Sequence, residues 1–201
     1  MLRRLVYSII LAALGYWGYS TWQSSVEKNR QQVERQAQKE KLKSRITEVA
    51  LKYGAVIDWP SRLTRENRLR DLPVLSAELQ DLWINRKPIL FVGKVRDIIR
   101  TSEEAVLLSI DYGWADPIFG HGIEALNAAG LRVKVQCANA LAAPLIAASS
   151  SSVAYSPFSN VALVANIDMI ESSTERGEKG EPIEVRTGTG KCIDIVLIPP
   201  H

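Results

Sequence analysis

Residues 5–26 form one uninterrupted stretch without Asp, Glu, Lys, Arg or His, LVYSIILAALGYWGYSTWQSSV. Arg3 and Arg4 precede this stretch, and charges resume at Glu27. A helix of about 20 apolar residues is long enough to cross the ~30 Å hydrocarbon core of a bilayer. The sequence therefore predicts a single membrane-spanning helix over residues 5–26, with a basic N-terminal flank, that tethers the rest of the chain to a lipid bilayer.

The C-terminal end of this stretch favours an anchor that is not cleaved. It is rich in aromatic residues, Tyr16, Trp17, Tyr19 and Trp22, and rings with a polar edge prefer the headgroup level. A secretory signal peptide would have a shorter apolar core and small residues at its cleavage site. A buried core helix does not fit, because every face is apolar and no other part of the chain is large enough to surround it.

The charges around the stretch leave two orientations open. A very short N-terminus with two arginines is typical of a signal anchor whose N-terminus stays in the cytoplasm, whereas the larger number of Lys and Arg after residue 26 favours a cytoplasmic domain. We favour the first orientation. It predicts a single-pass protein of the inner (cell) membrane with a periplasmic domain, and the cytoplasmic domain remains the alternative.

Residues 27–54 are predicted to form a polar helical stalk. They contain no Pro, and Gly appears only at position 54; the Gln, Glu, Lys, Arg and Ala that dominate are good helix formers. An apolar stripe follows its last turns at helical spacing, Leu42, Ile46, Val49 and Tyr53. This stripe fits either a parallel coiled coil that forms a homodimer or binds a protein partner, or a solvated stalk whose last turns dock on the next domain. Fewer than three clean heptads favour the stalk.

Residues 55–73, with Pro60 and four arginines, are predicted to be a linker, and residues 74–198 a domain of mainly β structure with helices. A helix from Ser76 to about Asn85 leads into the first strand. Hydrophobic alternation predicts five strands, at 88–99, 105–111, 131–137, 161–170 and 191–198, and an Ala-rich helix at 138–149. Val161, Leu163, Ala165, Ile167 and Met169 are expected on one face of the fourth strand. Five short strands close most simply into a small barrel, which removes exposed sheet edges.

Several segments of this domain resemble an OB-fold: FVGKVRDI, RVKVQC, VALVANIDMI and GKCIDI, with a helix ending in LWINRKPILFVG before the first strand. In particular, residues 72–198 resemble the OB domain of bacterial membrane-anchored proteins of the tRNA-anticodon-binding-like group. Gly93 stands where the first strand of such a barrel coils sharply. The resemblance implies a five-stranded OB-like barrel, but a fold alone implies no activity.

OB-folds often bind single-stranded nucleic acid, which requires a basic groove and aromatic platforms. Residues 1–55 carry ten Lys and Arg against four Asp and Glu, whereas the rest carries 15 against 18. The domain therefore lacks the overall positive charge that phosphate contacts need. Basic residues on the expected outer face, one aromatic residue and two residues near the last hairpin are the candidate binding residues: Lys94, Arg96, Trp114, Arg132, Lys134, Arg186 and Lys191.

No set of residues predicts a reaction, a metal or a cofactor. His121 is the one internal histidine, which cannot complete a usual metal site. TGTGK at 187–191 has Val185 and Cys192 where a Walker loop needs Gly and Ser or Thr, so a turn after the exposed hairpin tip ESSTERGEKGEPIE is expected instead. The sequence predicts a non-catalytic binding or assembly protein of the bacterial cell envelope. The alternatives are a membrane-anchored single-strand nucleic-acid-binding protein and an enzyme with an unfamiliar site.

Cys137 and Cys192 are the only cysteines. In an OB barrel the third and fifth strands are neighbours, so the two residues are expected near each other. Alternation places Cys137 on the inner face, but it places Cys192 with Asp194, on the face opposite Ile193. A disulfide requires both side chains on one face, which a bulge near Gly190 would bring about. A disulfide and two free thiols both remain open.

Overall fold

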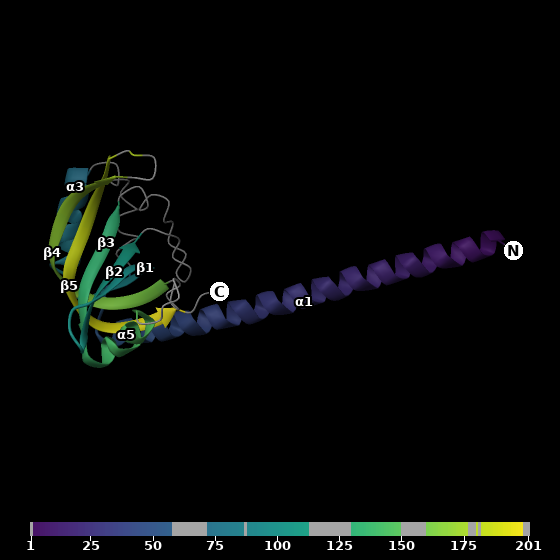
Figure 1. The fold of residues 1–201 in the computed structure, drawn as a ribbon, viewed down its shortest axis with the longest axis horizontal. Coiled ribbons are helices and arrows are strands. Elements are labelled where there is room, and N and C mark those ends of the chain that lie inside the picture. Colours follow the sequence, from purple (N-terminus) through teal and green to yellow (C-terminus); the bar gives the residue numbers. More distant parts are fainter. Residues whose placement is uncertain are drawn as a thin grey trace. The chain divides into compact units, whose positions relative to one another are not determined.

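A computed structural model describes residues 2–57, 72–86, 88–112, 130–149, 160–176, 180 and 182–198. After residue 52 the described chain is mainly β, with helices before the first strand and between the third and fourth strands (Figure 1). Its elements are α1 (Leu2–Lys52), α3 (Leu72–Trp83), β1 (Ile89–Arg100), β2 (Ala105–Tyr112), β3 (Leu131–Ala138), the 3-10 helix η2 (Asn139–Leu141), α5 (Ala143–Ser149), β4 (Asn160–Arg176) and β5 (Pro182–Ile198). The chain divides into two compact units, residues 1–42 and 43–201.

The five strands close into a barrel in the order β1–β2–β3–β5–β4. Every neighbouring pair is antiparallel except β3 and β5, which run parallel. A five-stranded ring with helices is therefore confirmed. The first three strands lie within one residue of their predicted bounds. The alternation is regular along β3, where each buried residue is followed by a less buried one.

The predicted turn at 187–191 is wrong, because these residues lie within β5, a strand of 17 residues. Two glycines there allow close packing instead of chain reversal. A Cβ atom on Gly188 would lie 2.8 Å from the ring of Trp83, and one on Gly190 would lie 1.9 Å from the backbone oxygen of Asn166. The helix before β1 also differs from its prediction, since it begins at Leu72 and not at Ser76.

Two register shifts occur where β4 pairs with β5. One falls between Ile167 and Met169, where Asp168 is the extra residue of β4 in the strand register. An extra residue on one strand reverses which face the following side chains occupy, so Met169 is 49% exposed while Ile167 is fully buried. The prediction that Met169 shares the inner face with Ile167 is therefore wrong. The second shift leaves Ile193 unpaired, between the pairs Val164–Asp194 and Ala165–Cys192.

The barrel interior is one apolar cluster to which α3 contributes Leu79, Leu82 and Trp83. The ring of Trp83 meets Phe91 of β1 edge to face, with centroids 5.2 Å apart and ring planes at 89°. This arrangement is the favoured one for aromatic pairs. α3 thus closes the core, and the remaining side chains of the strands point away from it.

A second buried surface covers part of the barrel's outside. Ile46 and Ala50, on the last turns of α1, are fully buried. Val56, just beyond the helix, bonds to the chain around β1: its N–H donates to Pro88 O at 2.9 Å, and its O accepts from Leu90 N at 3.1 Å. The buried residues outside the inner cluster include five on β1, β4 and β5: Leu90, Val92, Ala162, Val164 and Val196. We infer that the end of α1 docks on the face of β1, β4 and β5, as in the stalk interpretation.

The first part of α1 carries the predicted membrane segment. Among the described residues, no helix has both the length and the apolar character that a membrane crossing requires.

Candidate functional site

A groove of about 620 Å³ lies on the outer side of the barrel. Its floor includes Arg132 and Lys134 of β3, which alternate with the fully buried Val133 and Val135 and therefore point away from the core. All five strands contribute to the lining: Arg96, Asp97, Ile99, Leu107, Ser109, Arg132, Lys134, Glu171, Ser172, Ser173 and Thr187. The groove thus combines charged, hydroxyl and apolar side chains.

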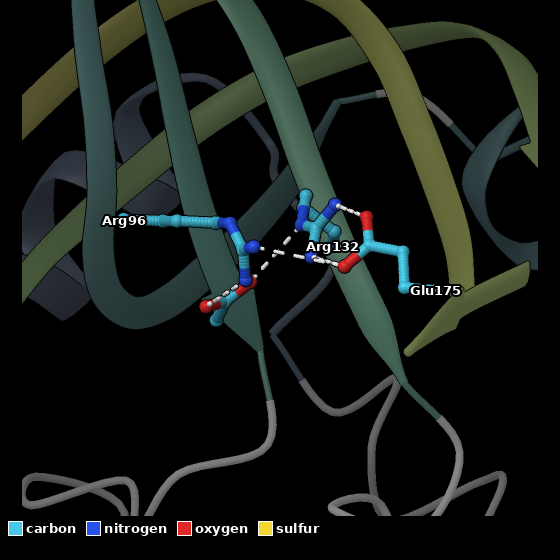
Figure 2. A network of polar contacts seen from close by, with 4 residues as sticks. Arg96, Arg132 and Glu175 are labelled. Carbon is cyan, nitrogen blue, oxygen red and sulfur yellow. Dashed lines mark hydrogen bonds and ion pairs between the residues drawn. The ribbon is translucent and has the colours of Figure 1, made fainter. Parts of the chain in front are cut away.

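Two arginines and two carboxylates form a network at this groove (Figure 2). The guanidinium of Arg132 donates to both oxygens of Glu175, at 2.5 and 3.0 Å, and its Nε donates to Asp111 at 3.1 Å. Arg96 donates to the other Asp111 oxygen at 3.3 Å and lies 3.6 Å from Glu175. In Figure 2 the labelled side chains of Arg96, Arg132 and Glu175 converge from β1, β3 and β4. Each arginine is therefore shared between two acids.

Local backbone geometry brings these four residues together. Asp111 and Arg132 are direct cross-strand partners of β2 and β3. Arg96 is the extra residue at a register shift between Val95 and Asp97 of β1, and such a bulge redirects a side chain. Glu175 stands far out on the β4–β5 hairpin, one pair before the last. The length of that hairpin is what carries its carboxylate to Arg132.

The ion pairs of the network stabilise the charged forms of the side chains that make them. The hydrogen bond from Arg132 holds the pKa of Glu175 below its usual range, and the same bond raises the pKa of Arg132. The Arg132 side chain is only 14% exposed, and a bidentate arginine–carboxylate pair is specific in geometry as well as in charge. Both arginines are therefore neutralised by neighbours and are poorly placed to hold phosphate groups.

Other polar groups at the groove remain available to bind a ligand. Within the described part of the chain, the charged ends of Asp97, Lys134 and Glu171 form no ion pair. Ser109 is 7% exposed and lines the groove, and its hydroxyl has no hydrogen-bond partner among the described residues. Because its hydroxyl lines the groove, Ser109 can form a hydrogen bond with a bound molecule. Ile99, 47% exposed, adds an apolar surface.

The structure unites three of the seven predicted binding residues, Arg96, Arg132 and Lys134, in the groove. Arg186 is elsewhere, because it pairs with the inward-facing Leu131. Its guanidinium bonds to Glu184 at 2.5 Å and to the Ser172 hydroxyl, so it supports the barrel end. Lys94 and Lys191 are exposed and do not line the groove, while Trp114 and His121 lie outside the described residues.

Two acids of the site were missed by reasoning from the sequence. Asp111 could have been found, because it follows Ser109 on the polar face of a strand whose bounds were predicted well. Glu175 could not, since its segment reads as a loop and its partner Arg132 is 43 residues away. Among the described residues, no group of three or more His, Cys, Asp or Glu side chains could hold a metal ion.

Comparison of the chain with protein-family models, with curated proteins and with solved structures found no match. A functional proposal therefore depends on the groove and on the properties of the sequence.

Proposed function

We propose that this protein is a membrane-tethered, non-catalytic OB-fold protein of the bacterial cell envelope whose barrel binds a polypeptide segment in the outer groove. Three features support the OB assignment: the ring order β1–β2–β3–β5–β4, the parallel pairing of β3 with β5, and a helix between β3 and β4. OB-folds use the outer face around β2 and β3, with neighbouring loops, for ligands. The groove lies on this face.

The proposed class of ligand rests on one observation, the ion pairs of Arg96 and Arg132 with Asp111 and Glu175. A nucleic-acid site needs unpaired cations for phosphates and aromatic rings for bases. In the described lining of the groove both arginines are already neutralised, and no aromatic residue is present. Lys134 is the one cation of the described lining that forms no ion pair. The alternative, single-strand binding, therefore finds one unpaired cation and no aromatic ring at this groove.

A polypeptide segment matches the groups that remain. Asp97 and Glu171 can receive a Lys or Arg side chain, and Lys134 can pair with a carboxylate. Ile99 and Leu107 offer an apolar surface, and the Ser109 hydroxyl can donate to a backbone carbonyl. Pockets of about 300–1,000 Å³ hold small ligands, so this groove accommodates a few residues of a chain.

Binding is tested with three fluorescent probes: a short Leu- and Lys-containing peptide, an acidic peptide of the same length, and a single-stranded oligonucleotide. We expect the basic peptide to bind best. Glu171→Lys reverses the charge of one acid at the groove. This change should weaken binding of the basic peptide about tenfold, or about 1.4 kcal/mol, because the ligand cation then meets a like charge. Fluorescence anisotropy measures each dissociation constant.

Lys191→Glu is the matched control, because this exposed charge lies outside the groove lining and its reversal should leave peptide affinity unchanged. Tight oligonucleotide binding that falls steeply with salt and disappears in Arg132→Ala would overturn the proposal in favour of the nucleic-acid alternative.

The proposed membrane tether is supported by the uncharged residues 5–26 and the aromatic residues at their C-terminal end. We expect the full chain to stay with cell membranes through an alkaline carbonate wash and to be released by detergent. A shortened chain starting at Lys43, where the second compact unit begins, should remain in the supernatant. Recovery of the full chain in the carbonate supernatant would exclude a transmembrane tether.

A further inference from the structure

The two cysteines meet in the barrel core. Cys137 of β3 is fully buried in the inner apolar cluster, and Cys192 of β5 is half-buried and packs against that cluster. The parallel register of β3 and β5 ends at the pair Gln136–Lys191, so the cysteines occupy the next position on each strand. These two strands therefore bring the only cysteines of the chain side by side.

The unpaired Ile193 explains how Cys192 reaches the inner face. Simple alternation from Ile195 would place Cys192 outside, with Asp194. Because β5 has one extra residue at Ile193, the inner face passes from Ile195 directly to Cys192. The predicted requirement for a bulge is thus met, although the bulge lies three residues beyond Gly190.

Both sulfurs are free thiols in this structure. The hydrogen bond between Cys192 and Cys137, followed by burial, raises the pKa of Cys192 far above its usual range. The Cys192 thiol also lies 3.8 Å from the backbone oxygen of Asp194, to which it donates. Because the thiolate is the reactive form, a folded and reduced barrel should react slowly with oxidants.

We propose that Cys137 and Cys192 form an intramolecular disulfide, closed while the chain folds in an oxidising compartment, that ties β3 to β5. The proposal does not depend on what the groove binds. Two S–H bonds break and one S–S bond forms; the two electrons and two protons pass to a disulfide-bearing oxidant, which leaves as two thiols. The exchange takes place as β5 joins β3, before both thiols are buried.

The test uses the full chain in detergent, unfolded in urea and refolded by dilution into either a glutathione redox buffer or dithiothreitol. Denatured, unreduced protein is then alkylated and its intact mass is measured. After oxidative refolding we expect no alkylated thiol and a monomer mass lower by two hydrogens. The urea midpoint should rise by roughly 1–2 M and return to the reduced value after dithiothreitol.

Cys192→Ala and Cys137→Ala are the control variants, and their urea midpoints should be the same in both buffers. The reduced, folded wild type placed in the glutathione buffer should keep both thiols much longer than the refolding chain does. Two free thiols in oxidatively refolded protein with a native spectrum would overturn the proposal. So would a bridged monomer that unfolds at lower urea than the reduced one.

Discussion

Gly190→Ala is expected to prevent the barrel from folding stably. The new Cβ would lie 1.9 Å from the backbone oxygen of Asn166 and 2.9 Å from the Cα of Ile167. Backbone atoms cannot rotate away as a side chain does, so β4 and β5 would have to separate at the centre of their pairing. Losing several hydrogen bonds worth about 1 kcal/mol each, together with disturbed packing, should cost more than about 4 kcal/mol. Total stabilities are about 5–15 kcal/mol.

Circular dichroism and urea unfolding of the full chain measure this effect, and Gly180→Ala is the matched control. Gly180 has a φ of +85° with nothing within 4 Å of an added Cβ. Its replacement should cost only the strain of a left-handed backbone, about 1–2 kcal/mol. If Gly190→Ala kept a native spectrum and unfolded at the same urea concentration as Gly180→Ala, the close approach of β4 and β5 would be refuted.

Trp83→Ala should destabilise the barrel by about 3–5 kcal/mol, because it removes the largest fully buried side chain among the described residues and its contact with Phe91. The same change should make Gly188→Ala tolerable. In the wild type an added Cβ at Gly188 meets the Trp83 ring at 2.8 and 2.9 Å. Without the ring, the methyl group enters the vacated space. We therefore expect the two costs to be non-additive by about 1–3 kcal/mol.

Urea unfolding of the wild type, both single variants and the double variant gives this coupling energy. Gly93→Ala is the comparison, because its Cβ would meet the Asp111 backbone oxygen at 2.7 Å, an obstacle that Trp83→Ala leaves in place. The loss of unfolding free energy caused by Gly93→Ala should be the same in the wild type and in Trp83→Ala. A double variant of Trp83 and Gly188 whose cost equals the sum of its single changes would show that the ring does not fill the space above Gly188.

Elements with regular alternation could be predicted from the sequence, and those set by long-range pairing could not. β3 reads clearly because Leu131, Val133 and Val135 are buried while the residues between them are not. The glycines of TGTGK resemble a turn, since the sequence does not show that Trp83 and the β4 backbone occupy the space beside them. The bulges at Asp168 and Ile193 were also hidden, because they exist only relative to a partner strand.

The candidate site, too, could be predicted from the sequence only in part. The outward direction of Arg132 and Lys134 follows from the local pattern of β3. The neutralisation of Arg132 does not, since it depends on a carboxylate carried by the distant end of the β4–β5 hairpin. Charge counts could argue against nucleic acid for the domain as a whole, whereas only the fold shows that the two arginines at the groove are already paired.

The position of β5 in the ring has a consequence for how the protein is made. β5 is the last of the five ring strands along the chain, yet it alone joins β3 to β4. Until it is added, two strand edges carry unsatisfied backbone groups, which is the state most open to aggregation. Pairing that spans so much of the sequence is slow to form. During synthesis the domain therefore remains an open sheet until its final strand emerges, and that strand brings Cys192 to Cys137 in the step that closes the ring.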